Sequence, residues 1–282
     1  MNSVSTLTAL VNLKEQGNTD LRSTYIGRNR INSVGLALEY FLKDMYCRTF
    51  SIGDLAIKER EYQKSFSWLG NPNNPPDFII QQSDAVEVKK IQSPSSTIAL
   101  NSSYPKAYLF NNDTRITRDC KSCEDGIGGW QKKDILYVIG YVAGQRVKRL
   151  WMVYGDCYAA EKGVYERVAN AINTGLASLQ NVQLSPTNEL GRVNRVDPLG
   201  ITQLRIRGMW QIENPHKVFS YIAGDDGLYC LMTKEKYIGL KREAVGDVIS
   251  KIQQYYTVEE VSIKNPNNPA INIDSVLIKG GL

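Results

Sequence analysis

Two short segments around Asp77 and Glu87 contain the side chains that phosphodiester hydrolysis needs. Pro76-Asp77 opens one apolar segment, and Glu87-Val88-Lys89 lies inside a second. Two carboxylates can hold Mg²⁺, a hard cation that prefers oxygen ligands, against a phosphate. An ammonium group can stabilise negative charge and orient the attacking water. We therefore predict that Asp77, Glu87 and Lys89 are catalytic, with Asp77, Glu87 and Val88 as the metal site.

A pair of strands must position these groups. Residues 85–91 have the pattern of a strand, on which Glu87 and Lys89 point the same way while Val86 and Val88 point into the core. A three-residue turn at 81–83 would place Asp77 directly opposite Glu87 across an antiparallel pair. The alternative is an exposed hairpin with a surface Glu–Lys pair, which has the same triplet.

The composition is that of a folded protein with one sizeable core. The chain has 282 residues, of which 42% are apolar and 22% charged, and this excludes disordered and fibrous classes. No apolar run reaches the roughly 18 residues of a membrane span, so we expect no membrane association and a cytoplasmic location. The five cysteines lack the spacing of a disulfide scaffold. Cys120 and Cys123 supply only half of a tetrahedral zinc site.

The positive charge is concentrated and rich in arginine. Net charge is +5, and residues 101–150 contain nine basic and five acidic side chains. Between residues 192 and 207, four arginines are opposed by Asp197 alone. Such a cluster favours a nucleic-acid partner more than the net charge does.

Strand and helix patterns are mixed along the chain, which predicts α/β architecture. No repeat or long linker marks a boundary, so we expect a single domain over 1–282. The patterns predict helices at 28–47, 157–179, 233–242 and 244–256, and strands at 62–68, 77–80, 85–91, 135–142, 147–154, 204–209 and 271–278. The helix at 157–179 is expected to cover the sheet.

Several of these blocks resemble a known nuclease family. Pro76-Asp77 and Glu87-Val88-Lys89 are similar to the motif of the PD-(D/E)xK nuclease superfamily. The chain further resembles type II restriction endonucleases of the NgoPII group, in blocks that cover 74–77, 84–91, 99–103, 190–198 and 204–210. The two arginine-rich blocks are the more restrictive part of this resemblance.

The resemblance implies a mixed central sheet flanked by helices, with the catalytic core at about 28–180. An arginine-rich DNA-reading segment would follow at about 190–217, and C-terminal helices and a strand at 218–282. It also implies a homodimeric, Mg²⁺-dependent enzyme that cuts double-stranded DNA at a short G·C palindrome, GGCC in that group. A cognate DNA methyltransferase is expected as a functional partner rather than a stable subunit.

Further site residues follow from the same reasoning. Glu39 lies on the first strong helix, from which related nucleases often add a carboxylate; a solvated helix-edge glutamate is the alternative. Because arginine reads guanine O6 and N7 bidentately, the arginine-rich segment is predicted to bind DNA through Arg192, Asn194, Arg195, Arg205 and Arg207. Strand alternation would direct Leu204 and Ile206 inward and the neighbouring guanidinium groups outward. Surface salt bridges are the competing interpretation for each arginine.

A polar segment after the predicted catalytic strand offers phosphate and sugar contacts. Its short donors and its lysine are Asn101, Ser102, Ser103 and Lys106. A plain polar loop would have the same composition.

Two other functions share these features. A non-catalytic DNA-binding protein would retain the fold without cutting. A repair or structure-specific nuclease would share the catalytic core but would not need arginines that read bases.

Overall fold

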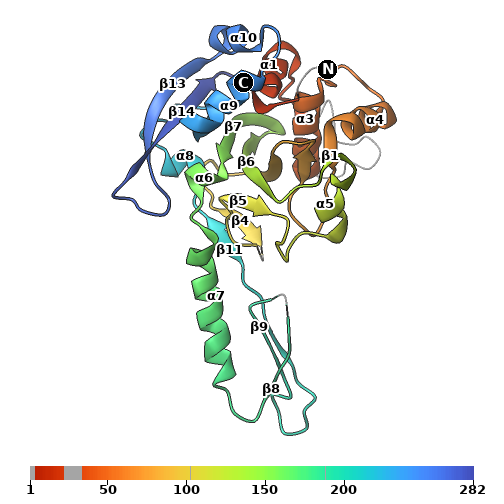
Figure 1. Ribbon diagram of the computed structural model, residues 1–282, viewed down its shortest axis with the longest axis vertical. Coiled ribbons are helices and arrows are strands. Elements are labelled where there is room, and N and C mark those ends of the chain that lie inside the picture. Colours follow the sequence, from red (N-terminus) through yellow and green to blue (C-terminus); the bar gives the residue numbers. More distant parts are fainter. Residues whose placement is uncertain (1–3, 22–33, 102, 188) are drawn as a thin grey trace.

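A mixed sheet forms the centre of the molecule, and an arm projects from it (Figure 1). The computed structural model describes residues 4–21, 34–101, 103–187 and 189–282. In sheet order the strands are β1 (Phe66–Trp68), β2 (Phe78–Ile80), β3 (Ala85–Ile91), β6 (Lys132–Ala143), β7 (Arg146–Tyr154), β12 (Leu228–Thr233), β14 (Asn272–Gly280) and β13 (Thr257–Lys264), with β5 (Tyr108–Phe110) also paired to β6. The predicted α/β fold with a mixed sheet is confirmed.

Strand directions place β3 between an antiparallel and a parallel neighbour. β3 pairs antiparallel with β2 and parallel with β6, while β7 pairs parallel with β12. The predicted hairpin β6–β7 turns at Gly144 and Gln145, both with positive φ, as a two-residue hairpin turn requires. Because β12, β14 and β13 continue the sheet beyond β7, the C-terminal segment is part of the central sheet.

Helices cover one face of the sheet. This face carries α1 (Thr6–Gln16), α3 (Val34–Cys47), α9 (Lys234–Glu243) and α10 (Val248–Tyr255). Leu38, Phe41, Leu42 and Met45 of α3 are fully buried there, at the spacing of one helix face. The predicted helix at 28–47 is confirmed from Val34 onward, and residues 28–33 lie outside the described residues.

A glycine lets α3 approach the sheet closely. A Cβ atom on Gly140 of β6 would lie 2.6 Å from Leu38 Cδ2, so a larger residue there would displace the helix. The close approach brings α3 against β3, the strand that carries Glu87 and Lys89.

The opposite face has shorter covering elements. These are α6 (Gly155–Tyr158), α8 (Pro215–Val218) and the strand pair β4 (Ile98–Asn101) with β11 (Trp210–Ile212). Trp151 stacks on Tyr229 at 4.7 Å between ring centroids in this second core. A third small cluster lies beside α5 (Arg118–Ser122) and a short 3₁₀ turn at Asp125–Ile127.

The predicted strand at 62–68 is wrong in its first half. Helix α4 (Leu55–Ser65) begins at an N-cap, where the Asp54 carboxylate accepts hydrogen bonds from Ala56 and Ile57 N–H. β1 starts only at Phe66. The rings of Tyr62 and Phe66 lie 6.2 Å apart, a contact that the i, i+4 spacing of a helix allows.

The helix predicted at 157–179 does not cover the sheet, so this expectation is also wrong. The chain instead forms α6 and then α7 (Lys162–Ala177), which has no buried residue and stands away from the core (Figure 1). α7 packs on the small antiparallel sheet of β8 (Gln183–Leu184), β9 (Gly191–Asn194) and β10 (Leu204–Ile206). A Cβ atom on Gly191 would lie 2.2 Å from Leu176 Cδ1, so this glycine sets the distance between helix and sheet. We call α7 and β8–β10 together the arm.

Among the described residues, no helix is both long enough and apolar enough to span a bilayer.

Candidate active site

Asp77, directly before β2, lies near Glu87 of β3. Phe78 pairs with Val86 and Ile79 with Ala85, and Asp77 N–H donates to Val86 O at 3.0 Å. Asp77 therefore lies at the end of this ladder, close enough to Glu87 for the two carboxyl groups to interact. The connecting turn is the three-residue turn 81–83 predicted from the sequence, closed by a bond from Ser83 N–H to Ile80 O.

Glu87 and Lys89 form an ion pair on the same side of β3. Lys89 Nζ lies 2.6 Å from Glu87 Oε1, and both side chains are largely shielded from solvent. The second oxygen, Glu87 Oε2, is buried and accepts no hydrogen bond from the described residues. A buried carboxylate oxygen without a donor is costly, and a bound cation would satisfy it.

The Asp77 carboxylate is fixed by the main chain of β3. Val88 N–H donates to Asp77 Oδ2 at 2.6 Å. Because the N–H and C=O of a strand residue point toward the same edge, the Val88 carbonyl is directed to the edge on which Asp77 lies. A valine side chain has no ligand atom, so this carbonyl is the only group with which Val88 could hold a metal.

Electrostatics at the site favour a cation. The pKa of Asp77 is raised to about 8, first by burial and then by the nearby Glu87 and Glu39 carboxylates, against the opposing effects of Lys89 and the Val88 N–H. Burial lowers the pKa of Lys89, but Glu87 and Asp77 outweigh that effect and the pKa is raised overall. The ammonium group therefore stays charged beside two carboxyl groups.

The donor set fits Mg²⁺ through oxygen atoms. Asp77, Glu87 and the Val88 carbonyl supply hard ligands of the kind that Mg²⁺ prefers, and Mg²⁺ commonly keeps waters in its remaining positions. The part of the chain that the structure describes contains no group of three or more His, Cys, Asp or Glu side chains placed to hold a metal. A cation here would therefore be held by two carboxylates and backbone oxygen.

The structure places Glu39 close enough to the site to act electrostatically on Asp77. Its partner is Lys43, one helical turn further along α3, whose Nζ lies 2.6 Å from Glu39 Oε1 and donates to Leu69 O at 3.2 Å. Sequence reasoning missed Lys43, although its i+4 spacing from Glu39 on the predicted helix was a usable signal.

The arm gathers four of the predicted DNA-binding side chains. In the β9–β10 register Arg205 lies opposite Arg192, and Leu204 opposite Val193. Directly paired residues share a sheet face, and the Val193 face is the one that α7 covers. The other, open face therefore carries Arg192, Asn194, Arg205 and, by alternation, Arg207. Arg195 follows β9 with a φ of 53°, where the strand ends.

Two expectations about this segment are corrected. Leu204 is directed to the helix side but remains 50% exposed, because α7 does not extend over it. Asp197 does not oppose the arginines, since its carboxylate accepts from Leu199 and Thr202 N–H and holds the turn between the strands. The opposing acid is Glu189, which contacts both Arg205 and Arg207. Glu189 precedes the interval from residue 192 to residue 207, in which Asp197 is the only acidic residue.

Lys106 is less exposed than a surface contact with phosphate requires. Lys106 is buried and lies 2.9 Å from Asp113 Oδ2 in an ion pair, with its ammonium 4.0 Å from the centroid of the Tyr104 ring. The structure therefore does not present Lys106 as a surface phosphate contact. Asn101 ends β4 opposite Trp210, and Ser103 N–H donates to Leu100 O. Ser102 lies outside the described residues.

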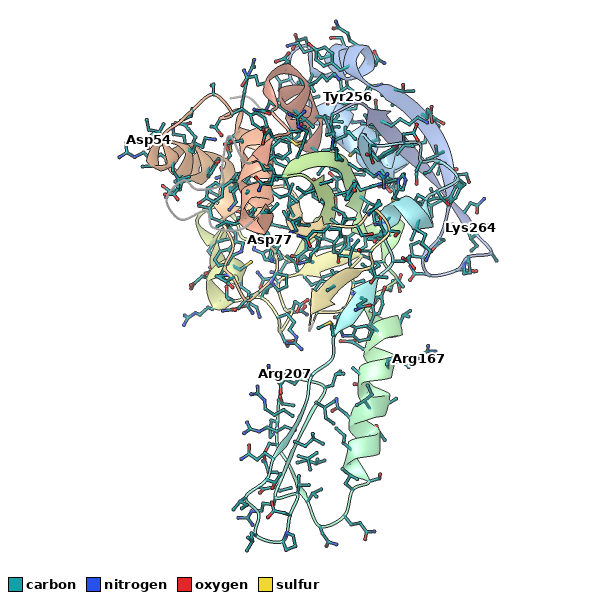
Figure 2. All side chains as sticks on the ribbon, turned by 180° about the vertical axis from the view of Figure 1, so that it is seen from behind. Asp54, Asp77, Arg167, Arg207, Tyr256 and Lys264 are labelled. Carbon is teal, nitrogen blue, oxygen red and sulfur yellow. The ribbon has the colours of Figure 1, made fainter. Side chains whose placement is uncertain are left out.

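Figure 2 shows where Asp77 lies relative to the arm. Asp77 is on the side of the core from which the arm projects, and Arg207 is on the part of the arm nearest the core (Figure 2). A mixed sheet flanked by helices, with an Asp–Glu–Lys group on the strand pair β2–β3, defines a restriction-endonuclease-like nuclease core.

Comparison with known proteins agrees with this class. The family model for the NgoPII restriction endonuclease matches residues 4–264. The type II restriction enzyme NgoPII of Neisseria gonorrhoeae is 39% identical over 269 residues, which cover 93% of this chain and 94% of that protein. No solved structure matches. The chain belongs to the NgoPII restriction endonuclease family and is therefore a site-specific deoxyribonuclease.

Proposed function

We propose that this enzyme hydrolyses double-stranded DNA with Mg²⁺ as its cofactor, at a short G·C palindrome whose sequence is GGCC. The observation that carries the catalytic part is the group formed by Asp77, Glu87 and Lys89, with Glu87 Oε2 buried and without a donor in the described residues. Glu39 of α3 is proposed to add a further carboxylate to this group.

Each residue has a defined task in this proposal. Asp77, Glu87 and the Val88 carbonyl would hold Mg²⁺, which when bound supplies a Lewis acid at the phosphate. Lys89, held by its ion pair with Glu87, orients the attacking water and stabilises the negative charge that develops on the phosphate. The Val88 N–H fixes the Asp77 carboxylate, so little reorganisation is needed during the reaction.

The open face of the arm would read the bases. Arg205 and Arg207 are exposed guanidinium groups that can donate to guanine O6 and N7, and Arg192, Asn194 and Arg195 lie beside them for base or phosphate contacts. Asn101, Ser102 and Ser103 are proposed to contact the backbone near the cleavage centre.

A homodimer follows from the symmetry of a palindrome, because two copies related by a two-fold axis read identical half-sites. The arm has unusually exposed apolar side chains, with Leu199 and Ile201 81% and 78% exposed. Light scattering after size exclusion should give about twice the chain mass of 31.7 kDa; a mass of one chain with and without a GGCC duplex would refute the dimer.

We further propose that the enzyme works in the cytoplasm, where the cell's DNA must be protected by a partner methyltransferase. All five cysteines are free thiols, as a reducing compartment favours. The genes adjoining this one should include a DNA methyltransferase.

Digestion of one sequenced plasmid tests the proposed function. Discrete fragments that require Mg²⁺ and whose ends map to GGCC support it. Discrete fragments with ends at another sequence would refute the GGCC site alone. Binding without any cutting would instead indicate a non-catalytic DNA-binding protein, and smears or cutting only at unusual DNA structures would indicate a repair nuclease.

A further inference from the structure

One carboxylate on the arm holds both of the arginines that are proposed to read guanine. Glu189 Oε2 accepts from Arg205 Nε at 3.0 Å, and Glu189 Oε1 accepts from Arg205 Nη2 at 2.8 Å. Glu189 Oε1 also accepts from Arg207 Nε at 2.7 Å. The Glu189 side chain is 15% exposed, whereas those of Arg205 and Arg207 are 53% and 64% exposed. The acid is therefore the inner member of the group.

The contacts use one edge of each guanidinium and leave another edge available. Glu189 occupies the Nε side of Arg205 and of Arg207. Neither Nη1 atom is among the donors to Glu189. Bidentate contact with guanine O6 and N7 needs two adjacent donors, which the Nη1 and Nη2 ends of a guanidinium provide. Glu189 engages Nε of both arginines and one hydrogen of Arg205 Nη2, so Nη1 and the second Nη2 hydrogen remain able to donate to guanine.

The position of this acid is unfavourable for simple attraction to DNA. A carboxylate beside the proposed base-reading face repels phosphates, which lowers affinity for any sequence. The hydrogen bond from Arg205, followed by that from Arg207, lowers the pKa of Glu189, so the repelling charge is present at neutral pH. Such a group weakens non-specific binding and orders the long arginine side chains before DNA arrives.

We propose that Glu189 is a positioning residue for sequence discrimination: it holds Arg205 and Arg207 in one orientation in which their Nη ends meet guanine. This inference rests on the proposed reading of a G·C site by the arm. It adds a residue whose removal should weaken specific binding even though it removes a negative charge.

The experiment compares two variants that lose the same charge. Glu189→Gln removes the acid that holds the arginines, and Glu166→Gln removes an acid on α7 whose ion-pair partner is Lys162. Both acids line the same cleft of about 690 Å³ at the base of the arm. Binding is measured by fluorescence anisotropy in Ca²⁺ with two probes, a duplex with a central GGCC and the same duplex with those four bases permuted to CGCG.

We expect Glu189→Gln to weaken binding to the GGCC duplex at least tenfold while binding to the permuted duplex is unchanged or tighter. Glu166→Gln should change both affinities by the same factor and keep their ratio. Glu189→Asp, which keeps the charge on a shorter side chain, should recover part of the ratio. Circular dichroism on each variant checks that the arm keeps its helix.

Three results would overturn the inference alone. If Glu189→Gln tightens binding to both duplexes equally, Glu189 is only a repelling charge; if it changes neither, the contacts are a surface ion pair. Weaker binding to both duplexes together with lost helix signal would show a purely structural role. If the wild-type enzyme does not distinguish the two duplexes, the proposed GGCC site fails first and this inference falls with it.

Discussion

Asp77 lies beside Glu87 at the end of the β2–β3 ladder, and Asp77 Oδ2 accepts a 2.6 Å hydrogen bond from the N–H of Val88. The arrangement brings two carboxyl groups together in a buried position beside one ammonium group. Burial and the negative charge of Glu87 make ionisation of Asp77 unfavourable until a cation is present. Proton release and metal binding at this site should therefore be coupled.

The coupling predicts how metal affinity depends on pH. Because the pKa of Asp77 is raised to about 8, the metal-free carboxyl group keeps its proton at neutral pH and loses it as the pH rises through that value. A metal ligand must be ionised, so affinity for Mn²⁺ or Ca²⁺ should increase by up to about tenfold per pH unit below pH 8 and level off above it. Titration calorimetry from pH 6 to 9 measures this. An affinity that is flat over this range would contradict the coupling.

The oxygen donors predict which metals support the reaction. Cleavage should require Mg²⁺ or Mn²⁺, and Ca²⁺ should support specific binding with little cleavage, because its larger and more flexible coordination shell does not match the site. Cleavage of a labelled GGCC duplex in each metal tests this. Undiminished cutting in excess chelator would refute a metal-dependent site.

Base reading by the arm predicts a specific loss in two variants. Arg205→Ala and Arg207→Ala should each cost about 1–3 kcal/mol of specific binding per contact, and in a dimer the loss applies twice. A gel shift with cognate and scrambled duplexes gives the result. If both duplexes lose affinity equally, the two arginines are backbone clamps, and base reading would shift to Arg192, Asn194 and Arg195.

Lys106 should matter for stability instead of DNA affinity. Its ammonium is paired with Asp113 in a buried position, so Lys106→Ala leaves a buried carboxylate without its partner, at a cost of about 3–5 kcal/mol. Urea unfolding measures this change, with the exposed Lys217→Ala as control. A variant of unchanged stability whose binding weakens for every sequence would restore a phosphate-contact role.

The strands near Asp77 and Glu87 could be predicted because strand alternation and turn length indicate the same arrangement. Residues 85–91 alternate as a strand, the turn 81–83 has the length that brings Asp77 and Glu87 together, and Pro76-Asp77 opens the adjacent strand. The α/β class also followed from the strand and helix patterns. These features depend on neighbours in sequence, which periodicity can detect.

The arm could not be predicted because its position depends on contacts between residues that are distant in sequence. α7 has the apolar spacing of a core helix, yet no residue of α7 is buried, and only contacts distant in sequence show that it packs on three short strands. In the same way, composition predicts neither the contacts of Glu189 nor the burial of Lys106. A charge count does not show that Glu189 holds two arginines, or that Lys106 turns inward to Asp113.

The most direct test of the account is the single-turnover rate of DNA cleavage by Asp77→Asn and Lys89→Ala, each compared with the wild-type enzyme on one GGCC duplex in Mg²⁺. Each variant should lose at least about 100-fold in rate, because a group that stabilises the transition state is removed. Specific binding should remain largely intact in both, since the proposed base and backbone contacts are made by other residues, on the arm and at 101–103. Cleavage at the wild-type rate in either variant would contradict the assignment of Asp77, Glu87 and Lys89 as the catalytic centre.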